Sequence, residues 1–183
     1  MPKTLLGIAL FISFSSIAFA EPTDDGADLK PPQDGWRSNV MLGVARFPSS
    51  NMDLGTGVSA SVLVGREWVR DQLGLQVGLE LEAESFGHVL SSNGDLNLYS
   101  ARPTVRLSYY AGHWMPYAEL GVGYTYASAA DASDNMLAIA GAAGVSYRFT
   151  DRLALGAYVR YEPDFEPALN QFVDFGLAFN VLH

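Results

Sequence analysis

The stretch over residues 73–84 alternates apolar and polar residues without a break. It reads LGLQVGLELEAE, with Leu, Val or Ala at every odd position and Gly, Gln or Glu at every even position. Side chains of a β-strand point alternately to opposite faces, so this pattern predicts a strand with one apolar and one polar face. A soluble sheet would bury the apolar face in a core. A transmembrane barrel would turn that face to lipid and direct Glu80, Glu82 and Glu84 inward.

The N-terminus has the pattern of an export signal. Lys3 precedes an apolar run over 5–12, and Ala18-Phe19-Ala20 follows as a small-residue cleavage site. We therefore predict a cleaved signal peptide over residues 1–20, because the run is too short for a permanent transmembrane helix. A retained N-terminal anchor is the alternative. Residues 21–35 are acidic and proline-rich, which predicts a disordered tail, and residues 36–183 form the remaining domain.

From residue 36 onward the sequence reads as strands separated by polar or Gly/Pro turns, with no helical period. Eight strands with short connections favour consecutive antiparallel hairpins. The expected fold is all-β: an eight-stranded antiparallel up-and-down transmembrane β-barrel. The strands are predicted near 36–46, 57–66, 73–86, 96–111, 115–127, 136–149, 152–162 and 171–182.

The two faces of these strands decide between a soluble sandwich and a transmembrane barrel. The proposed outward faces carry apolar and aromatic residues without a charge, and no Lys follows Lys30. The opposite faces are rich in Gly, Ala and Ser, which suit the narrow interior of an eight-stranded barrel better than a solvated surface. Tyr and Phe gather towards the strand ends, as interfacial aromatics do. Trp36, Trp68 and Trp114 share one end of such a barrel, which we assign to the periplasmic interface together with both termini.

The predicted inner face holds charges of both signs. An unpaired buried charge has a large free-energy cost, so these groups should pair. We expect Arg106 to face Glu119 and Arg160 to face Asp174. A salt-bridged plug that fills the lumen is the expected role, and a gated conduit or a lumenal ligand site is the alternative. The candidates are Glu80, Glu82, Glu84, Arg102, Arg106, Glu119, Arg148, Arg160 and Asp174.

Two segments carry a family resemblance. GVSYRFTDRL at 144–153, continuing to YVRY at 158–161, is similar to the late hairpin of OmpA/OmpX-type small outer-membrane barrels, and PYAELGVGY at 116–124 resembles their fifth strand. The alternating C-terminal segment from Phe175 resembles the signal by which outer-membrane barrels are recognised for assembly, although it ends in His183 rather than Phe or Trp. The resemblance implies a Gram-negative outer-membrane location, contact with the barrel assembly machinery, and an envelope-structural or surface-interaction role.

A weaker resemblance raises an enzymatic alternative. The region 116–123 also resembles the lipid A 3-O-deacylase barrels, a family that carries a His-x-Ser-Asn motif on its late strands. The equivalent stretch here, 158–164, contains neither His nor Ser. A Ser/His/Glu set can be drawn from Glu84, His88 and Ser91 or Ser92, but no oxyanion motif accompanies it. We therefore expect no enzymatic activity, with a lipid A hydrolase or a small low-conductance channel as alternatives.

Composition limits the partners. The net charge of -9 argues against nucleic acid, and the absence of Cys with only three scattered His predicts no cofactor and no metal site. We expect a monomer whose partners are outer-membrane lipid and lipopolysaccharide. The predicted surface loops at 47–56, 87–95, 128–135 and 163–170 contain acidic residues but no Lys or Arg. These loops are either simply solvated or bridged to lipid phosphates by divalent cations.

Overall fold

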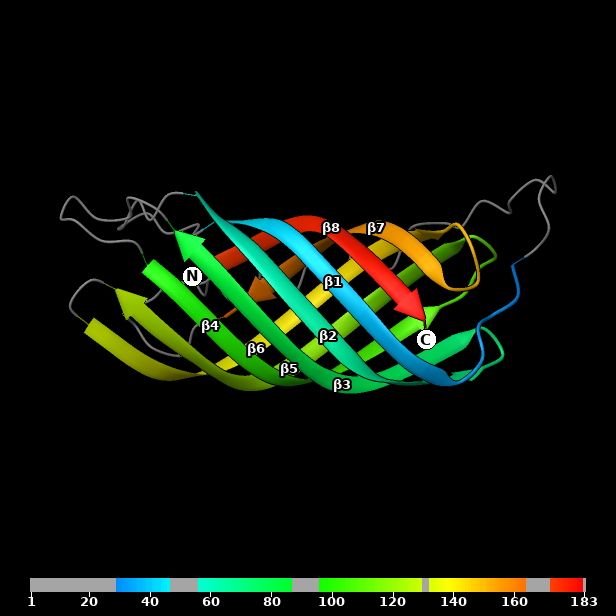
Figure 1. Cartoon of the computed structure of the whole chain (residues 1–183), viewed down its shortest axis with the longest axis horizontal. Coiled ribbons are helices and arrows are strands. Elements are labelled where there is room, and N and C mark those ends of the chain that lie inside the picture. Colours follow the sequence, from blue (N-terminus) through cyan, green and yellow to red (C-terminus); the bar gives the residue numbers. More distant parts are fainter. Residues whose placement is uncertain (1–28, 47–55, 87–95, 130–131, 164–171, 183) are drawn as a thin grey trace, which may run out of the picture.

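The computed structural model describes residues 29–46, 56–86, 96–129, 132–163 and 172–182. Its strands form a closed barrel in which each strand pairs with the next and β8 pairs with β1 (Figure 1). Closure removes the exposed sheet edges that an open sheet would have. The predicted fold class is confirmed. The strands are β1 (Gly35–Arg46), β2 (Thr56–Arg70), β3 (Leu73–Phe86), β4 (Leu96–Tyr109), β5 (Trp114–Ala129), β6 (Ala132–Arg148), β7 (Leu153–Glu162) and β8 (Phe172–Leu182).

The two ends of the barrel differ in their connections. The β2–β3 hairpin turns at Asp71 and Gln72, where Asp71 adopts a φ of 55°, the left-handed region that two-residue hairpin turns use. The β4–β5 and β6–β7 turns lie at the same end, with the start of β1 and the finish of β8 (Figure 1). We call this the turn end. The opposite end, where β1, β3, β5 and β7 finish, is the loop end.

No helix in the described segments is both long and apolar enough to cross a membrane.

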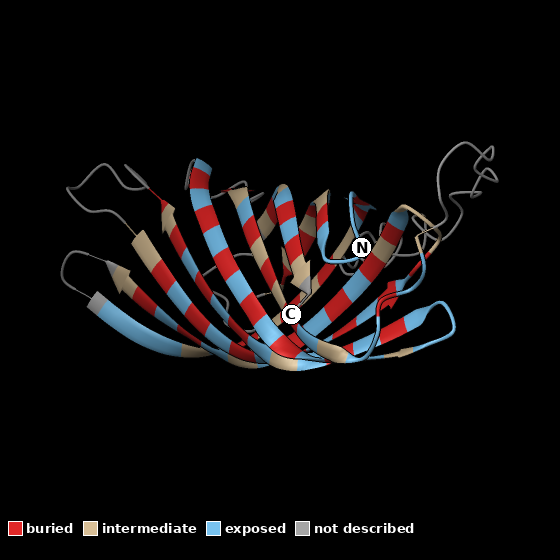
Figure 2. Cartoon of the chain, turned by 45° about the vertical axis from the view of Figure 1, so that its right-hand side comes forward, coloured by how far each residue is buried: buried red, intermediate tan, exposed pale blue. Residues whose placement is uncertain are grey.

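Burial alternates residue by residue around the barrel, which gives each strand a banded appearance (Figure 2). In β3, Leu79 is 50% exposed while its neighbour Glu80 is 2% exposed. The apolar side of the alternation thus points out of the barrel and the polar side points into it. In the described strands the core is the lumen itself, rather than a layer between two sheets.

Several strands extend beyond the apolar pattern that predicted them. β2 continues to Arg70, so Trp68 lies in a strand opposite Leu75 rather than in a connection. The charged residues near its finish interrupt the pattern, but backbone pairing with β3 continues. Arg66 consequently adds a charge to an outward face predicted to have none. Its guanidinium lies 5.8 Å from the centre of the Trp68 ring.

The β5–β6 hairpin corrects a predicted loop. β5 and β6 pair as far as Ala129 and Ala132, so most of the segment 128–135 is strand. Asp134, expected in that loop, is an exposed β6 residue whose carboxylate accepts a hydrogen bond from the amide of Asn135. The residues of this segment are small or polar, so the sequence shows no apolar alternation that would have predicted a strand here. The other predicted acidic loop residues, Asp53, Asp95, Asp131, Asp164 and Glu166, lie outside the described residues.

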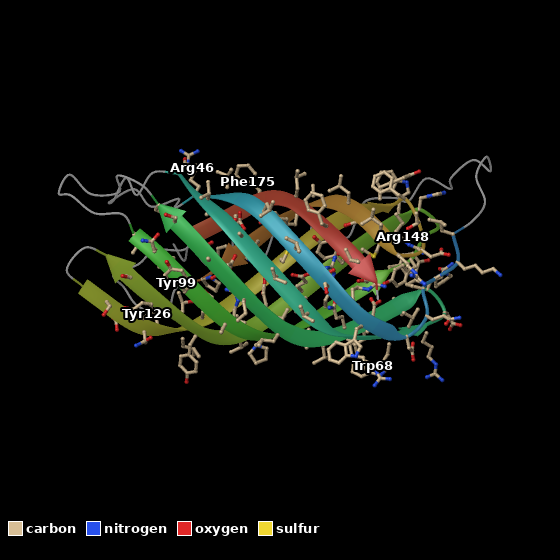
Figure 3. The ribbon with its side chains drawn as sticks, in the orientation of Figure 1. Arg46, Trp68, Tyr99, Tyr126, Arg148 and Phe175 are labelled. Carbon is tan, nitrogen blue, oxygen red and sulfur yellow. The ribbon has the colours of Figure 1, made fainter. Side chains whose placement is uncertain are left out.

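Aromatic side chains mark both ends of the outer surface. Trp36, Trp68 and Trp114 are 43% to 60% exposed and lie towards the turn end. Tyr99 and Tyr126 project outward nearer the loop end, opposite in position to Trp68 (Figure 3). An aliphatic band separates the two groups. Two aromatic zones flanking an apolar band are typical of barrels that cross a lipid bilayer.

Candidate functional site in the barrel lumen

The lumen contains all nine charged residues that the sequence placed there. Each side chain points inward and none is more than 5% exposed. The strict alternation of the strands explains this, since one residue of known direction fixes all others of the same parity. The described lumen also buries three charged residues that were not among the candidates: Arg37, Glu67 and Glu162.

The largest set of ion pairs crosses the middle of the lumen. Arg102 of β4 pairs with Glu80 at 3.5 Å and also with Glu82 and Glu162. Arg160 of β7 pairs with the same two β3 carboxylates, Glu80 and Glu82. Because β3 and β7 are not neighbours in the sheet, these bonds tie opposite walls of the barrel together. We call these five residues the central network.

The structure corrects two details of the predicted pairing. Arg160 does lie opposite Asp174 in the β7–β8 register, but its guanidinium reaches across the lumen to two carboxylates instead. Asp174 accepts a 2.7 Å hydrogen bond from the Tyr158 hydroxyl. Glu162, which was not among the candidates, is 5% exposed and bonds to Arg102. Glu162 is the last residue of β7, and its side chain points inward like that of Arg160, which lies two residues earlier.

Arg106 and Glu119 face each other across the β4–β5 pairing, as the register from the sequence implied. The Arg106 Nη1 and Glu119 Oε1 atoms are 3.2 Å apart. The guanidinium also lies over the ring of Tyr117, 3.5 Å from the ring centre. A cation over an aromatic face is attracted by the ring quadrupole, and more strongly where water is excluded. This pair therefore stabilises the part of the lumen that lies between the central network and the turn end.

A second ion pair near the turn end was missed from the sequence. Arg37 Nη2 lies 2.5 Å from Glu67 Oε2, and both side chains are buried. The Tyr110 hydroxyl donates a 2.7 Å hydrogen bond to Glu67. Burial raises the pKa of Tyr110 well above its ordinary value, so the hydroxyl keeps its proton. Extending the β2 alternation by one residue beyond 66 would have placed Glu67 inside.

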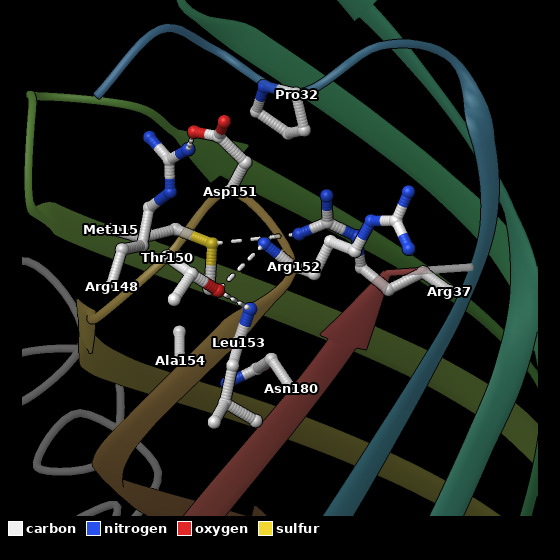
Figure 4. Close-up of a pocket in the computed structure, with 10 residues that line it drawn as sticks. All are labelled: Pro32, Arg37, Met115, Arg148, Thr150, Asp151, Arg152, Leu153, Ala154 and Asn180. Atoms are coloured by element: carbon white, nitrogen blue, oxygen red, sulfur yellow. Dashed lines mark hydrogen bonds and ion pairs between the residues drawn. The ribbon is translucent and has the colours of Figure 1, made fainter.

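Arg148 contacts backbone at the turn end rather than the central network. It donates hydrogen bonds to the carbonyls of Gly112 and Lys30, and its ion pair with the exposed Asp151 spans 3.6 Å. It lines a small cavity of about 10 Å³ beside Arg37 and Pro32 (Figure 4). Residues 29–34, part of the predicted tail, thus contact the barrel.

One cluster of carboxylates in the loop-end half has fewer partners. Oxygen atoms of Glu82, Glu84 and Asp174 lie within 4.8 Å of one another, and all three residues are buried. Glu84 Oε1 and Asp174 Oδ1 have no hydrogen-bond partner among the described residues. Ala45 lies opposite Asp174 in the β1–β8 register, and Leu98 lies opposite Glu84 in the β3–β4 register. The apolar cluster that these two residues form with Phe86 and Ala127 therefore borders the acidic cluster.

The outer surface is hollowed near the loop end. A row of small residues on neighbouring strands, Ala60, Ala83 and Ala101, forms the floor, and tyrosine rings on β4 and β5 form a wall. The floor and wall are apolar or aromatic and face away from the lumen. The wall residues are Tyr99, Tyr124 and Tyr126.

The histidines give no catalytic arrangement in the described segments. His113 stacks on Tyr147 with ring centres 5.2 Å apart, and its Nδ1 is 2.9 Å from the Arg148 carbonyl oxygen. It therefore packs at the turn end beside Trp114. The alternative set built on His88, Ser91 and Ser92 lies outside the described residues, as does His183.

Comparison with known proteins agrees with this geometry. The family model described as outer membrane protein beta-barrel domain matches residues 6–180. Neisserial surface protein A (NspA) is 18% identical, with a TM-score of 0.62 over 81% of this chain and 97% of that chain. Ail, the attachment invasion locus protein of Yersinia pestis, is 15% identical, with a TM-score of 0.51 over 81% of this chain and 98% of that one.

The outer membrane enzyme PagL is also similar in structure. It is 11% identical, with a TM-score of 0.51 over 80% of this chain and 99% of that chain. No curated protein sequence matches the chain. At these identities the solved structures show a shared fold. The match over nearly the whole sequence, with the closed barrel, makes the chain a member of the outer-membrane β-barrel protein family.

Proposed function

We propose that this outer-membrane barrel is a non-enzymatic monomer with a lumen closed by its own side chains. Its role is structural in the envelope or consists of interactions at the cell surface. The observation that carries the proposal is the central network, in which Arg102 and Arg160 connect strands on opposite walls. The side chains that hold the walls together also fill the lumen, so they leave little room for a path through the barrel.

The width of the barrel supports a closed lumen. The interior of an eight-stranded barrel is about wide enough for its own side chains. Apolar clusters lie towards each end, one around Phe86 and one around Tyr110 and Met115. A small channel, the alternative, would need a continuous polar path past these clusters and past the central network.

The two ends suggest an orientation and a set of partners. We assign the turn end, with both described chain ends, to the periplasm and the loop end to the cell surface. The groove floored by Ala60, Ala83 and Ala101 then faces the lipopolysaccharide leaflet, where an acyl chain fits it. Strand β8 closes the barrel against β1, which fits a C-terminal strand recognised by the assembly machinery.

The structural similarity to the outer membrane enzyme PagL supports an enzyme as the competing function, and the sequence resemblance suggests a lipid A hydrolase. That similarity shows the fold alone, because one barrel architecture supports many functions. Residues 158–163 include the lumenal Tyr158, Arg160 and Glu162 but no His or Ser. Arg160 and Glu162 are engaged in ion pairs with lumenal partners. None of these side chains is positioned as a nucleophile with a base.

Reconstitution of the mature barrel with lipopolysaccharide separates these functions. We expect the mass spectrum of lipid A to be unchanged after prolonged incubation, and the same protein to pass no steady ion current in a planar bilayer. Loss of an acyl chain from lipid A would establish the hydrolase. A stable current would establish the channel. A mock preparation from cells that do not express the protein, purified in the same way, controls for contaminating hydrolases and pores.

A further inference from the structure

We propose that the loop-end half of the lumen holds one hard divalent cation, coordinated by Glu82, Glu84 and Asp174. Glu82 and Glu84 come from β3 and Asp174 from β8. These strands are separated in the sheet by β1 and β2, so only the curvature of the closed barrel brings the carboxylates together. One oxygen from each lies within 4.8 Å of the other two.

This spacing suits a single ion. Oxygen ligands of Ca²⁺ lie about 2.3 to 2.6 Å from the metal, so two ligands on opposite sides are separated by up to about 5 Å. Three oxygens within that limit can therefore all contact one ion after small side-chain adjustments. The donor set is all carboxylate, which favours Ca²⁺, Mg²⁺ or Mn²⁺ over the metals that select nitrogen or sulfur ligands.

Two of the three carboxylates have an oxygen that accepts no hydrogen bond from the part of the chain that the structure describes. Glu84 is 3% exposed, and its Oε1 has no hydrogen-bond partner in the described segments. The Tyr158 hydroxyl donates to Asp174 Oδ2, and the Ser59 hydroxyl lies nearby, but Asp174 Oδ1 accepts no hydrogen bond of ordinary geometry from the described residues. Glu82 already binds Arg102 and Arg160, but each carboxylate oxygen has two lone pairs and can accept a second contact. A buried acceptor without a donor indicates a missing partner.

The balance of charge also points to a cation. In this part of the described lumen, two guanidinium groups, those of Arg102 and Arg160, face five carboxylates. Buried carboxylates that lack a counter-charge are strongly disfavoured, so a cation or protons must neutralise the surplus. The five carboxylates are Glu80, Glu82, Glu84, Glu162 and Asp174.

The surroundings would keep a bound ion in place. The apolar cluster around Phe86 and Leu98 borders the acidic cluster, and Gly43 of β1 leaves the space that Asp174 and Tyr158 use. A Cβ at position 43 would overlap the Asp174 carboxylate and the Tyr158 hydroxyl. Exchange of the ion should therefore be slow in the folded barrel, and loading is best done during refolding.

The experiment refolds the mature barrel in detergent with Mn²⁺ or with EDTA, followed by desalting into EDTA and counting of the retained metal. We expect about one Mn²⁺ per wild-type barrel, displaced when Ca²⁺ is present during refolding. Glu84→Gln and Asp174→Asn each remove one ligand charge with little change in shape, and both should lose the ion. Asp134→Asn removes an exposed carboxylate at the same end of the barrel and should retain it.

Two results would overturn the proposal. One is a wild-type barrel that retains no more Mn²⁺ than Glu84→Gln. The other is an infrared band of a protonated carboxylic acid that is present in the Mn²⁺-refolded wild type and lost in Glu84→Gln, since a proton would then occupy the place of the metal. If Glu84→Gln does not fold, the metal count of the wild type and of Asp174→Asn decides the question.

Discussion

Replacing Arg160 by methionine should lower the free energy of unfolding by about 3 to 5 kcal/mol. The substitution keeps much of the side-chain volume but removes one of the two guanidiniums that pair with both Glu80 and Glu82. Arg102 alone then faces these two buried carboxylates and Glu162. Removing one partner of a buried ion pair is costly because the remaining charge stays buried and uncompensated. A urea titration of reversible folding into lipid vesicles measures the difference.

Arg152 provides a matched control for this substitution. It is an exposed arginine in the β6–β7 turn, so Arg152→Met should change the free energy of unfolding by no more than about 0.5 kcal/mol. A loss below about 1 kcal/mol for Arg160→Met would contradict this expectation, because that is the range of solvent-exposed ion pairs. The bonds across the lumen would then not hold the walls together.

Replacing Leu79 by arginine should cost about 2 to 4 kcal/mol of folding free energy in a bilayer. Leu79 lies midway along β3 on the outer face and is 50% exposed. If that face meets lipid, an arginine there must be placed in or drawn out of the hydrocarbon. The same vesicle-based unfolding titration measures the cost.

Leu73 is the control within the same strand. It is 51% exposed on the same face but begins β3 at the turn end, at the level expected for the membrane interface. Leu73→Arg should therefore cost only about 0 to 1 kcal/mol. Equal costs at the two positions would show that the outer face does not experience a depth-dependent environment.

The sequence predicted the directions of side chains better than their partners. Alternation over 73–84 placed Glu80, Glu82 and Glu84 inside the barrel, and the register of a short turn placed Arg106 opposite Glu119. Both inferences depend only on geometry within one strand or one hairpin. The lumenal position of Asp174 followed in the same way from β8.

Contacts across the lumen could not be predicted from the alternation within a strand or the register of a hairpin. Arg160 has Asp174 as its hairpin partner but binds two carboxylates of β3, because a long side chain in a narrow barrel reaches the opposite wall. The same curvature brings Asp174 to Glu84. Neither contact has a signature in sequence spacing, since both depend on barrel closure and tilt.

The ends of strands were the other source of error. Glu67 and Glu162 lie close to the finishes of β2 and β7, where charged residues interrupt the apolar pattern. Neither was among the predicted lumenal charges, although their parity directs them inward. Backbone pairing continues beyond the point where the alternation of apolar and polar side chains stops. These positions were therefore identified only from the structure.

Thiol reactivity shows directly whether the lumen is closed by its own side chains. The chain has no cysteine, so a single introduced thiol is the only one present. Ser61→Cys and Ser108→Cys place it at lumenal positions that are 3% and 1% exposed, and Asp151→Cys places it in an exposed turn. In the folded, reconstituted barrel, a water-soluble maleimide should modify Asp151→Cys rapidly and the two lumenal cysteines only after unfolding. Modification of Ser61→Cys in the folded barrel as fast as Asp151→Cys would show that the lumen is open and water-filled rather than closed by side chains.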